Sequence, residues 1–140
     1  MNDRVKPTFS TCEEATLEEI SHRLGARGWA KHVTAQRLLS DWRELSMSVD
    51  RCEMTVDDYT NDLISRDGLE VVLSECPEPL CTKLRLSIEI ADNQFLARTL
   101  EDVEHTLGQY FQIDQSSAWW WHRRPTAGPL AEYLKCPPPA

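Results

Sequence analysis

Apolar residues recur at helical spacing over most of the chain, and the clearest helix they predict lies over residues 31–52. In this segment the apolar positions are separated by alternating steps of four and three residues, which is the spacing of a seam along one side of a helix. We therefore predict that the seam packs into the hydrophobic core. It consists of Leu38, Trp42, Leu45, Val49 and Cys52.

A shorter helix is expected before this one. Two capping-box sequences, Thr11–Glu14 and Thr16–Glu19, are each able to start it. Gly25 is a natural end, since glycine readily adopts the left-handed conformation that follows many helices. Residues 1–10 are expected to form a loose arm. The apolar stripe of this helix is Leu17, Ile20 and Leu24.

A third helix is predicted over residues 55–76, because Thr55–Asp58 forms another capping box and Pro77 ends the pattern. Two sets of apolar residues follow the cap, and the second set does not continue the register of the first. We therefore expect a break or kink near Asp67 and Gly68. The first set is Val56, Tyr59 and Leu63, and the second is Leu69, Val72, Leu73 and Cys76.

Residues 79–107 fit two patterns. Apolar and polar residues alternate strictly over residues 83–90, which is typical of a strand. The same segment also fits a helical row, and no turn signal separates Ile90 from the helix-favouring run through His105. We predict one long helix with apolar character on two faces, as the central member of a bundle has. The helical row is Leu80, Leu84, Ile88, Ala91, Phe95, Thr99 and Val103.

The C-terminal part contains an aromatic stretch, Tyr110–Phe111 and then Trp119–Trp121, followed by a short helix from Gly128. Three consecutive indoles cannot face the same way, so at least one is expected to be partly exposed. Residues 136–140 are expected to fray. Together, residues 1–140 are predicted to form one all-α domain, an antiparallel bundle of three long helices with an N-terminal helix and a C-terminal aromatic flap.

The net charge of −8 is concentrated in one segment. Residues 53–76 contain one arginine and seven acidic residues, whereas residues 1–52 are neutral. With the first apolar set of the third helix facing inward, the outward positions are Asp57, Asp58, Asn61 and Asp62. Such a field repels phosphate backbones and attracts a basic protein. These four residues are therefore our leading candidates for a partner-binding face, with a solvated face that binds nothing as the alternative.

A second candidate contact surface combines Trp120 with Arg123 and Arg124, since Trp and Arg are the residues most enriched at binding hot spots. Core packing of one or two of the indoles is the interpretation that the sequence favours over this contact surface. Neither interpretation depends on the acidic segment.

No recognisable catalytic or metal site is found. Glu19–His22 and Asp102–His105 have the carboxylate-x-x-His spacing of di-iron bundles, but each histidine lies about 200° around its helix from a core residue and so faces outward. There is no nucleophile elbow and no glycine-rich phosphate loop. The five cysteines include no CxxC pair, which favours reduced thiols. We expect no cofactor and no metal.

Residues 16–25 followed by a helix are similar to the opening of a helix-turn-helix, with Gly25 at the turn. The next helix has an apolar seam rather than a short polar recognition surface. The overall negative charge also opposes binding to DNA. A DNA-binding regulator is therefore the second hypothesis for function, and an enzyme with an unrecognised site is the third.

The leading hypothesis is a small acidic non-enzymatic protein-binding module that docks a basic partner. In its size, acidity and lack of catalytic motifs the chain is similar to the immunity proteins and antitoxins that bacteria make against their own basic toxins. No motif matches a particular family. The first thirty residues contain no run typical of a signal peptide, and no stretch approaches the ~20 apolar residues of a membrane span. We expect a cytoplasmic protein with no membrane or nucleic-acid partner.

Overall fold

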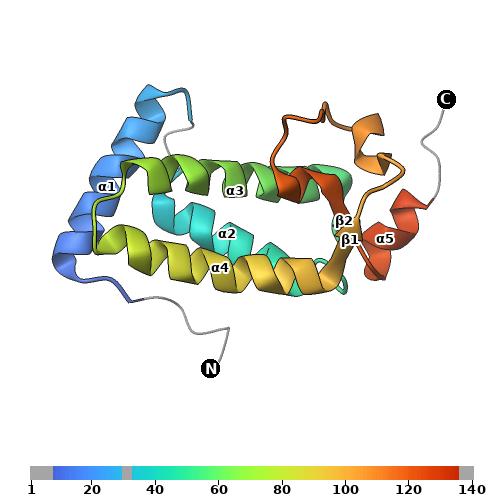
Figure 1. Ribbon diagram of the computed structural model, residues 1–140, viewed down its shortest axis with the longest axis horizontal. Coiled ribbons are helices and arrows are strands. Elements are labelled where there is room, and N and C mark those ends of the chain that lie inside the picture. Colours follow the sequence, from blue (N-terminus) through green and yellow to red (C-terminus); the bar gives the residue numbers. More distant parts are fainter. Residues whose placement is uncertain (1–7, 30–32, 136–140) are drawn as a thin grey trace.

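The computed structural model describes residues 8–29 and 33–135. Three long antiparallel helices, α2 (Ala35–Ser48), α3 (Val56–Glu75) and α4 (Leu80–Arg98), form the body of the molecule, and α1 (Thr11–Ala26) lies across one end of them (Figure 1). This confirms the predicted all-α bundle with an N-terminal helix and a C-terminal flap. The flap contains a two-stranded antiparallel sheet of β1 (Thr99–Glu101) and β2 (Arg123–Pro125), the 3-10 turns η1 (Thr106–Gln109) and η2 (Trp119–His122), and α5 (Gly128–Leu134).

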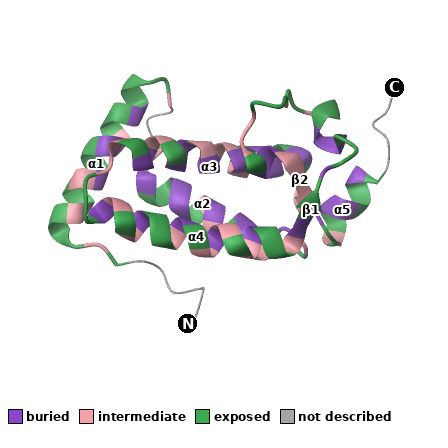
Figure 2. Ribbon diagram, viewed as in Figure 1, coloured by how far each residue is buried: buried purple, intermediate pink, exposed green. Residues whose placement is uncertain are grey.

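The helix α2 is the centre of the bundle, because it packs on both α3 and α4, which contact each other less. Its predicted seam is confirmed from Leu38 to Val49, where all four side chains are buried (Figure 2). The predicted seam is too long at its C-terminal end, because α2 ends at Ser48 and Cys52 is exposed. At the other end Thr34 caps the helix by accepting the N–H of Arg37 at 3.0 Å. Lys31 and His32, which the prediction included, lie outside the described residues.

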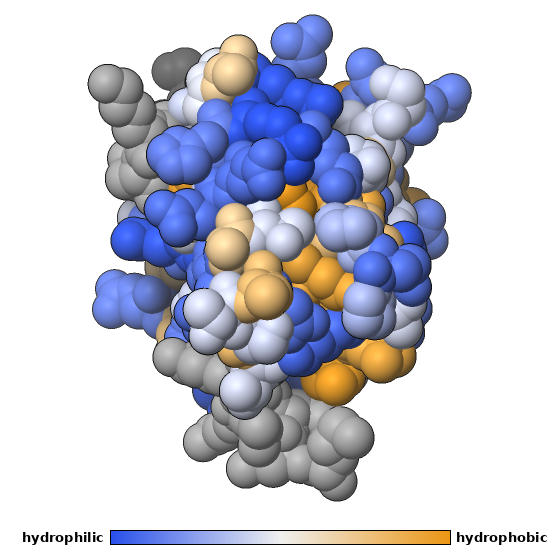
Figure 3. All heavy atoms as spheres, turned by 90° about the vertical axis from the view of Figure 1, so that its left-hand side faces the viewer, coloured by the Kyte–Doolittle hydropathy of each residue, from blue (hydrophilic) through white to orange (hydrophobic). Residues whose placement is uncertain are grey.

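The N-cap of α1 lies one residue before the predicted one. Ser10 and Glu13 form the capping box, so neither Thr11 nor Thr16 is the N-cap. The predicted stripe is confirmed, since its three side chains are fully buried. The end of the molecule formed by α1 has a mostly hydrophilic surface, with apolar atoms visible between the hydrophilic ones (Figure 3).

The expected break in α3 is wrong, because the helix is continuous past Asp67 and Gly68. The change of register does not break the helix, because α3 buries residues on more than one face, against both α2 and α4. In the first half Tyr59 stacks on Phe95 of α4. In the second half the helix approaches α2 so closely that a Cβ added at Gly68 would lie 2.8 Å from Leu38. Different faces of α3 are therefore buried along one continuous helix.

Residues 83–90 are helical, as predicted, but α4 ends at Arg98 rather than near residue 107. The chain leaves the helix to form β1, and a tight turn follows. In that turn the buried Asp102 carboxylate accepts the N–H groups of Thr106 and Leu107, each at 3.0 Å. Val103, expected in the core, is 72% exposed. The second apolar face of α4 is also open to solvent, since Leu86 and Leu96 are exposed.

The predicted C-terminal helix is confirmed as α5, with Leu130 and Leu134 buried. One of the three consecutive indoles, Trp119, is exposed, in agreement with the expectation. Gly128 starts α5 at a positive φ of 91°, with its Cα against the backbone of the α2–α3 connection. This close approach anchors the flap to the bundle.

Candidate functional site

Acidic side chains of two neighbouring helices meet on one side of the molecule. We define the acidic face as Asp41 of α2 together with Asp57, Asp58, Asn61 and Asp62 of α3. Asp57, Asp58 and Asn61 are exposed to solvent, whereas Asp41 and Asp62 are half-buried. The structure brings Asp41 and Asp58 close enough to Asp62 to act on its carboxyl group.

Asp58 has a structural role within this face. Its carboxylate accepts the backbone N–H of Thr55 at 3.1 Å, and the Thr55 hydroxyl accepts the N–H of Asp58 at 3.0 Å. This reciprocal capping box satisfies two N–H groups that the first turn of a helix leaves unpaired. A substitution at Asp58 therefore changes the start of α3 as well as the charge.

Asp62 is the electrostatically unusual member of the face. Burial raises the pKa of its carboxyl group to about 7, and the negative charges of Asp41 and Asp58 contribute to the rise. Burial also raises the pKa of Asp41, although Arg37, at 3.8 Å, partly opposes this. Among residues 8–29 and 33–135, no basic side chain forms an ion pair with Asp62. Asp62 is therefore an uncompensated acid at a half-buried position.

A hollow of about 520 Å³ opens beside Asp62, between α2, α3 and the segment that follows α1. Its walls are partly apolar, and its charged groups come from three parts of the chain. Two of them already have partners: Arg27 pairs with Glu75 at 3.3 Å, and Arg37 pairs with Asp41. The residues lining the hollow are Arg27, Gly28, Trp29, Val33, Arg37, Leu38, Asp41, Asn61, Asp62, Ile64 and Ser65.

The second predicted contact surface needs correction. Trp120 is only 4% exposed, and its indole N–H donates to Asp67 at 2.8 Å, so it is not available as a surface anchor. The side chain of Arg123 donates to the hydroxyl and carbonyl oxygens of Thr99, both at 2.8 Å. Arg124 is half-buried, with its guanidinium 3.9 Å from Asp102. All three residues hold the flap together.

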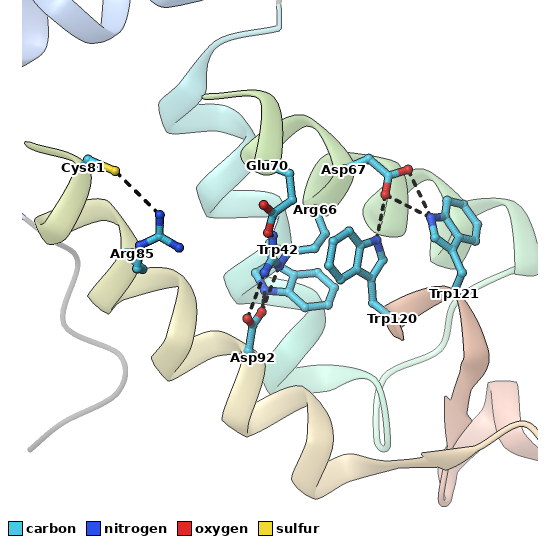
Figure 4. A network of polar contacts seen from close by, with 9 residues as sticks. All are labelled: Trp42, Arg66, Asp67, Glu70, Cys81, Arg85, Asp92, Trp120 and Trp121. Carbon is cyan, nitrogen blue, oxygen red and sulfur yellow. Dashed lines mark hydrogen bonds and ion pairs between the residues drawn. The ribbon is translucent and has the colours of Figure 1, made fainter. Parts of the chain in front are cut away.

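One carboxylate fixes two of the indoles. Asp67 of α3 accepts the N–H of Trp120 and the N–H of Trp121, the latter at 3.0 Å (Figure 4). Beside it the guanidinium of Arg66 lies 4.3 Å from the centroid of the Trp120 ring. Asp67 follows Asp62 by five positions, about 140° around the helix. The Asp67 and Asp62 side chains thus leave α3 in different directions, and Asp57, also five positions from Asp62, lies at the far edge of the acidic face.

A buried ion pair lies beneath the indoles. Arg66 makes two parallel hydrogen bonds to Asp92 of α4, each of 3.0 Å, and a third to Glu70 (Figure 4). Asp92 also accepts the indole N–H of Trp42 at 2.9 Å. Because every polar partner here is supplied from within the bundle, the network links α2, α3 and α4 rather than presenting a reactive group.

The histidines of the two carboxylate-x-x-His segments are exposed, as expected, but the second segment is not helical. His105 adopts a left-handed conformation at φ 55° in the turn after β1. In the described ranges no group of three or more potential metal ligands comes together. Four cysteines are free thiols, and Cys136 lies outside the described residues.

Sequence reasoning missed Asp41 and Asp67. Asp41 lies in a different helix from the other acidic residues, and only the packing of α2 on α3 brings it close to Asp62. In the sequence Asp67 resembles the start of a new helical segment, because Asp67 and Glu70 have the spacing of a capping box. No signal within either segment identifies its partner.

Comparisons with protein-family models, with curated proteins and with solved structures gave no match for this chain. Residue roles are therefore assigned from the geometry of this molecule alone. Among the described helices, none combines the length and apolar character that crossing a bilayer requires.

Proposed function

We propose that this chain is a small non-enzymatic binding protein that docks a basic partner protein through its acidic face, as immunity proteins and antitoxins do with bacterial toxins. The observation that carries the proposal is the half-buried carboxylate of Asp62, which lies beside a hollow and has no ion-pair partner among residues 8–29 and 33–135, within a face formed by four acidic side chains. An uncompensated acid at such a position weakens the folded state, and a basic partner removes that penalty on binding.

The arrangement of the face supports rapid and selective association. Its carboxylates come from α2 and α3, two rigid helices, so their charges stay in a fixed pattern while a partner approaches. Complementary fields of this kind raise association rates by about 10–10³-fold, and they select partners more than they add affinity. The segment of strongest negative charge in the sequence supplies three of the four acids.

A helix-turn-helix regulator is supported less well by the same structure. Residues 27–34 separate α1 from α2, which is longer than the 3–4-residue turn typical of that motif. The helix α2, which would be the recognition helix, packs on both α3 and α4 and has its seam in the core. It is poorly placed to enter a groove of DNA.

A bacterial cytoplasmic location is part of the proposal. The free thiols support it, because Cys12 and Cys52 are exposed to solvent and so depend on a reducing environment.

The proposal is tested by comparing what three forms of the protein capture from a lysate of the native host. The face variant carries Asp41→Asn, Asp57→Asn and Asp62→Asn, and it leaves Asp58 to cap α3. The control variant carries Glu14→Gln, Glu18→Gln and Glu19→Gln, which remove three exposed charges from α1. Each variant includes one acid of a first helical turn, so their effects on helix dipoles are matched.

We expect the wild type and the control variant to capture the same basic protein and the face variant to lose most of it. Equal capture by all three forms would show that the acidic face is a solvated surface. Capture of an acidic or neutral protein would contradict the proposed class of partner.

A further inference from the structure

The hollow beside Asp62 suggests a more specific contact than a charged surface. We propose that this pocket receives one lysine or arginine side chain of the partner protein, whose cation pairs with Asp62. This inference rests on the proposed function, because the side chain belongs to the docked partner.

The lining of the pocket matches the two parts of such a side chain. Trp29, Val33, Leu38 and Ile64 provide apolar wall, while Asp62 and Asn61 place oxygen acceptors on the α3 side. Lysine and arginine have an apolar stem and a charged head, and they commonly bury the stem while the head stays polar. A volume of about 520 Å³ is within the range of pockets that hold small ligands.

Among the described charged residues that line the pocket, Asp62 is the one without an oppositely charged partner, so it is the position at which a cation can pair. Arg27, from the segment after α1, is paired with Glu75, and Arg37 of α2 is paired with Asp41. The remaining charged groups that act on Asp62 are Asp41 and Asp58, both negative. A cation placed at Asp62 is therefore attracted by Asp62 and Asp58, while Asp41 adds less because Arg37 is paired with it.

The experiment uses a fragment of the expected side chain and needs no partner protein. n-Butylguanidinium is titrated into uniformly labelled protein, and NMR follows the indole N–H of Trp29 and the carboxyl carbon of Asp62. Guanidinium without a stem and n-butanol without a charge are the matched probes. The variants are Asp62→Asn and, as a control, Glu18→Gln.

We expect n-butylguanidinium to shift the Trp29 signal saturably and to lower the pKa of Asp62 by about one unit or more, since a nearby cation favours the carboxylate. Asp62→Asn should weaken this binding at least about tenfold, which corresponds to ~1.4 kcal/mol. Glu18→Gln should leave it unchanged. Equal binding of stemless guanidinium, or equal binding by Asp62→Asn, would overturn the assignment.

The chain's own Lys31 and His32, which lie outside the described residues, directly precede Val33 of the pocket. Binding of the probe only after Lys31→Ala or His32→Ala would show that the chain fills its own pocket, and it would overturn the proposal. The two proposals fail differently. Probe binding without any captured basic protein contradicts the proposed function, whereas capture that depends on the acidic face without probe binding contradicts only the pocket.

Discussion

At the scale of single residues, the least expected feature is that Asp62 lies half-buried with no counter-ion in the described part of the chain. Burial and two neighbouring carboxylates disfavour its charged form, so its pKa rises from an ordinary value near 3.8 to about 7. A folded protein that retains such a group loses stability when the group ionises. We propose that this loss of stability is retained because the same carboxylate binds the basic partner.

The first prediction concerns the pH dependence of stability. The folded state holds the Asp62 proton more tightly than the unfolded chain does, so unfolding releases a proton between about pH 4 and pH 7. The contribution of this group to stability is therefore full below about pH 4 and is lost as the pH rises through about 7. Asp62→Asn removes that loss, so the variant should be more stable than the wild type at pH 8, by on the order of 1–3 kcal/mol.

Urea unfolding of both proteins at pH 5 and pH 8 measures this difference. The relative advantage of the variant should grow with pH. A difference between the two proteins that stays constant over this range would show that Asp62 titrates normally.

At the scale of elements, the C-terminal flap depends on one side chain of α3. Asp67 accepts both indole N–H groups of the flap, from Trp120 and Trp121. Buried indoles that lose their acceptor keep the cost of desolvation without the compensating bond. The stability of the flap therefore depends more on Asp67 than on any polar residue at the surface of the flap.

The second prediction is that Asp67→Ala destabilises the protein by about 1–3 kcal/mol, since it leaves two buried donors unpaired. Amide hydrogen exchange should accelerate in residues 119–125 and change much less in α1. Glu89→Ala, at an exposed position of α4, is the control and should stay within about 0.5 kcal/mol of the wild type. Uniform acceleration over the whole chain would show that the flap is not a separate unit.

The third prediction contrasts two glycines. At Gly128 the φ of 91° disfavours any side chain, and a Cβ would lie 2.6 Å from the carbonyl oxygen of Asp50. Gly128→Ala should therefore cost about 2 kcal/mol or more. Gly25 lies within α1 with no atom near its missing Cβ, so Gly25→Ala should stabilise the protein by about 0.5–1 kcal/mol. Thermal unfolding of the two variants provides the comparison.

The elements show which features a sequence predicts and which it does not. The seam of α2, the stripe of α1 and the cap of α3 were predictable, because each is encoded by residues within one turn or two of one another. The end of α4 was not, since it depends on a turn organised by Asp102 and on pairing of β1 with residues far along the chain. The register of α3 misled for a similar reason: α3 packs against both α2 and α4 and so buries more than one of its faces without a break.

The candidate site also contains some residues that the sequence predicts and others that it does not. The outward acids of α3 follow from its periodicity alone. Asp41 does not, because its proximity to Asp62 requires two helices to be packed. Trp120 was assigned to the surface from its chemistry, whereas its burial depends on Asp67, more than fifty positions earlier.

At the scale of the whole molecule, α3 separates structure from proposed function. Asp67 holds the indoles of the aromatic flap, and Asp62, about 140° around the helix from it, belongs to the acidic face. The arginines of the flap are used in internal contacts, so they do not neutralise that face. The negative charge of the acidic face is therefore left available to a partner.

The measurement that tests this account most directly is the association rate with the captured basic partner at two ionic strengths. At ~0.1 M and ~1 M the screening length falls from about 10 Å to about 3 Å, so steering by exposed charges is largely removed at the higher value. We predict that salt slows association of the wild type and the Glu14/Glu18/Glu19 control about tenfold or more. The Asp41/Asp57/Asp62 face variant should associate slowly at both ionic strengths, with a much smaller change in dissociation. Association rates that respond to salt equally in all three proteins would contradict the account.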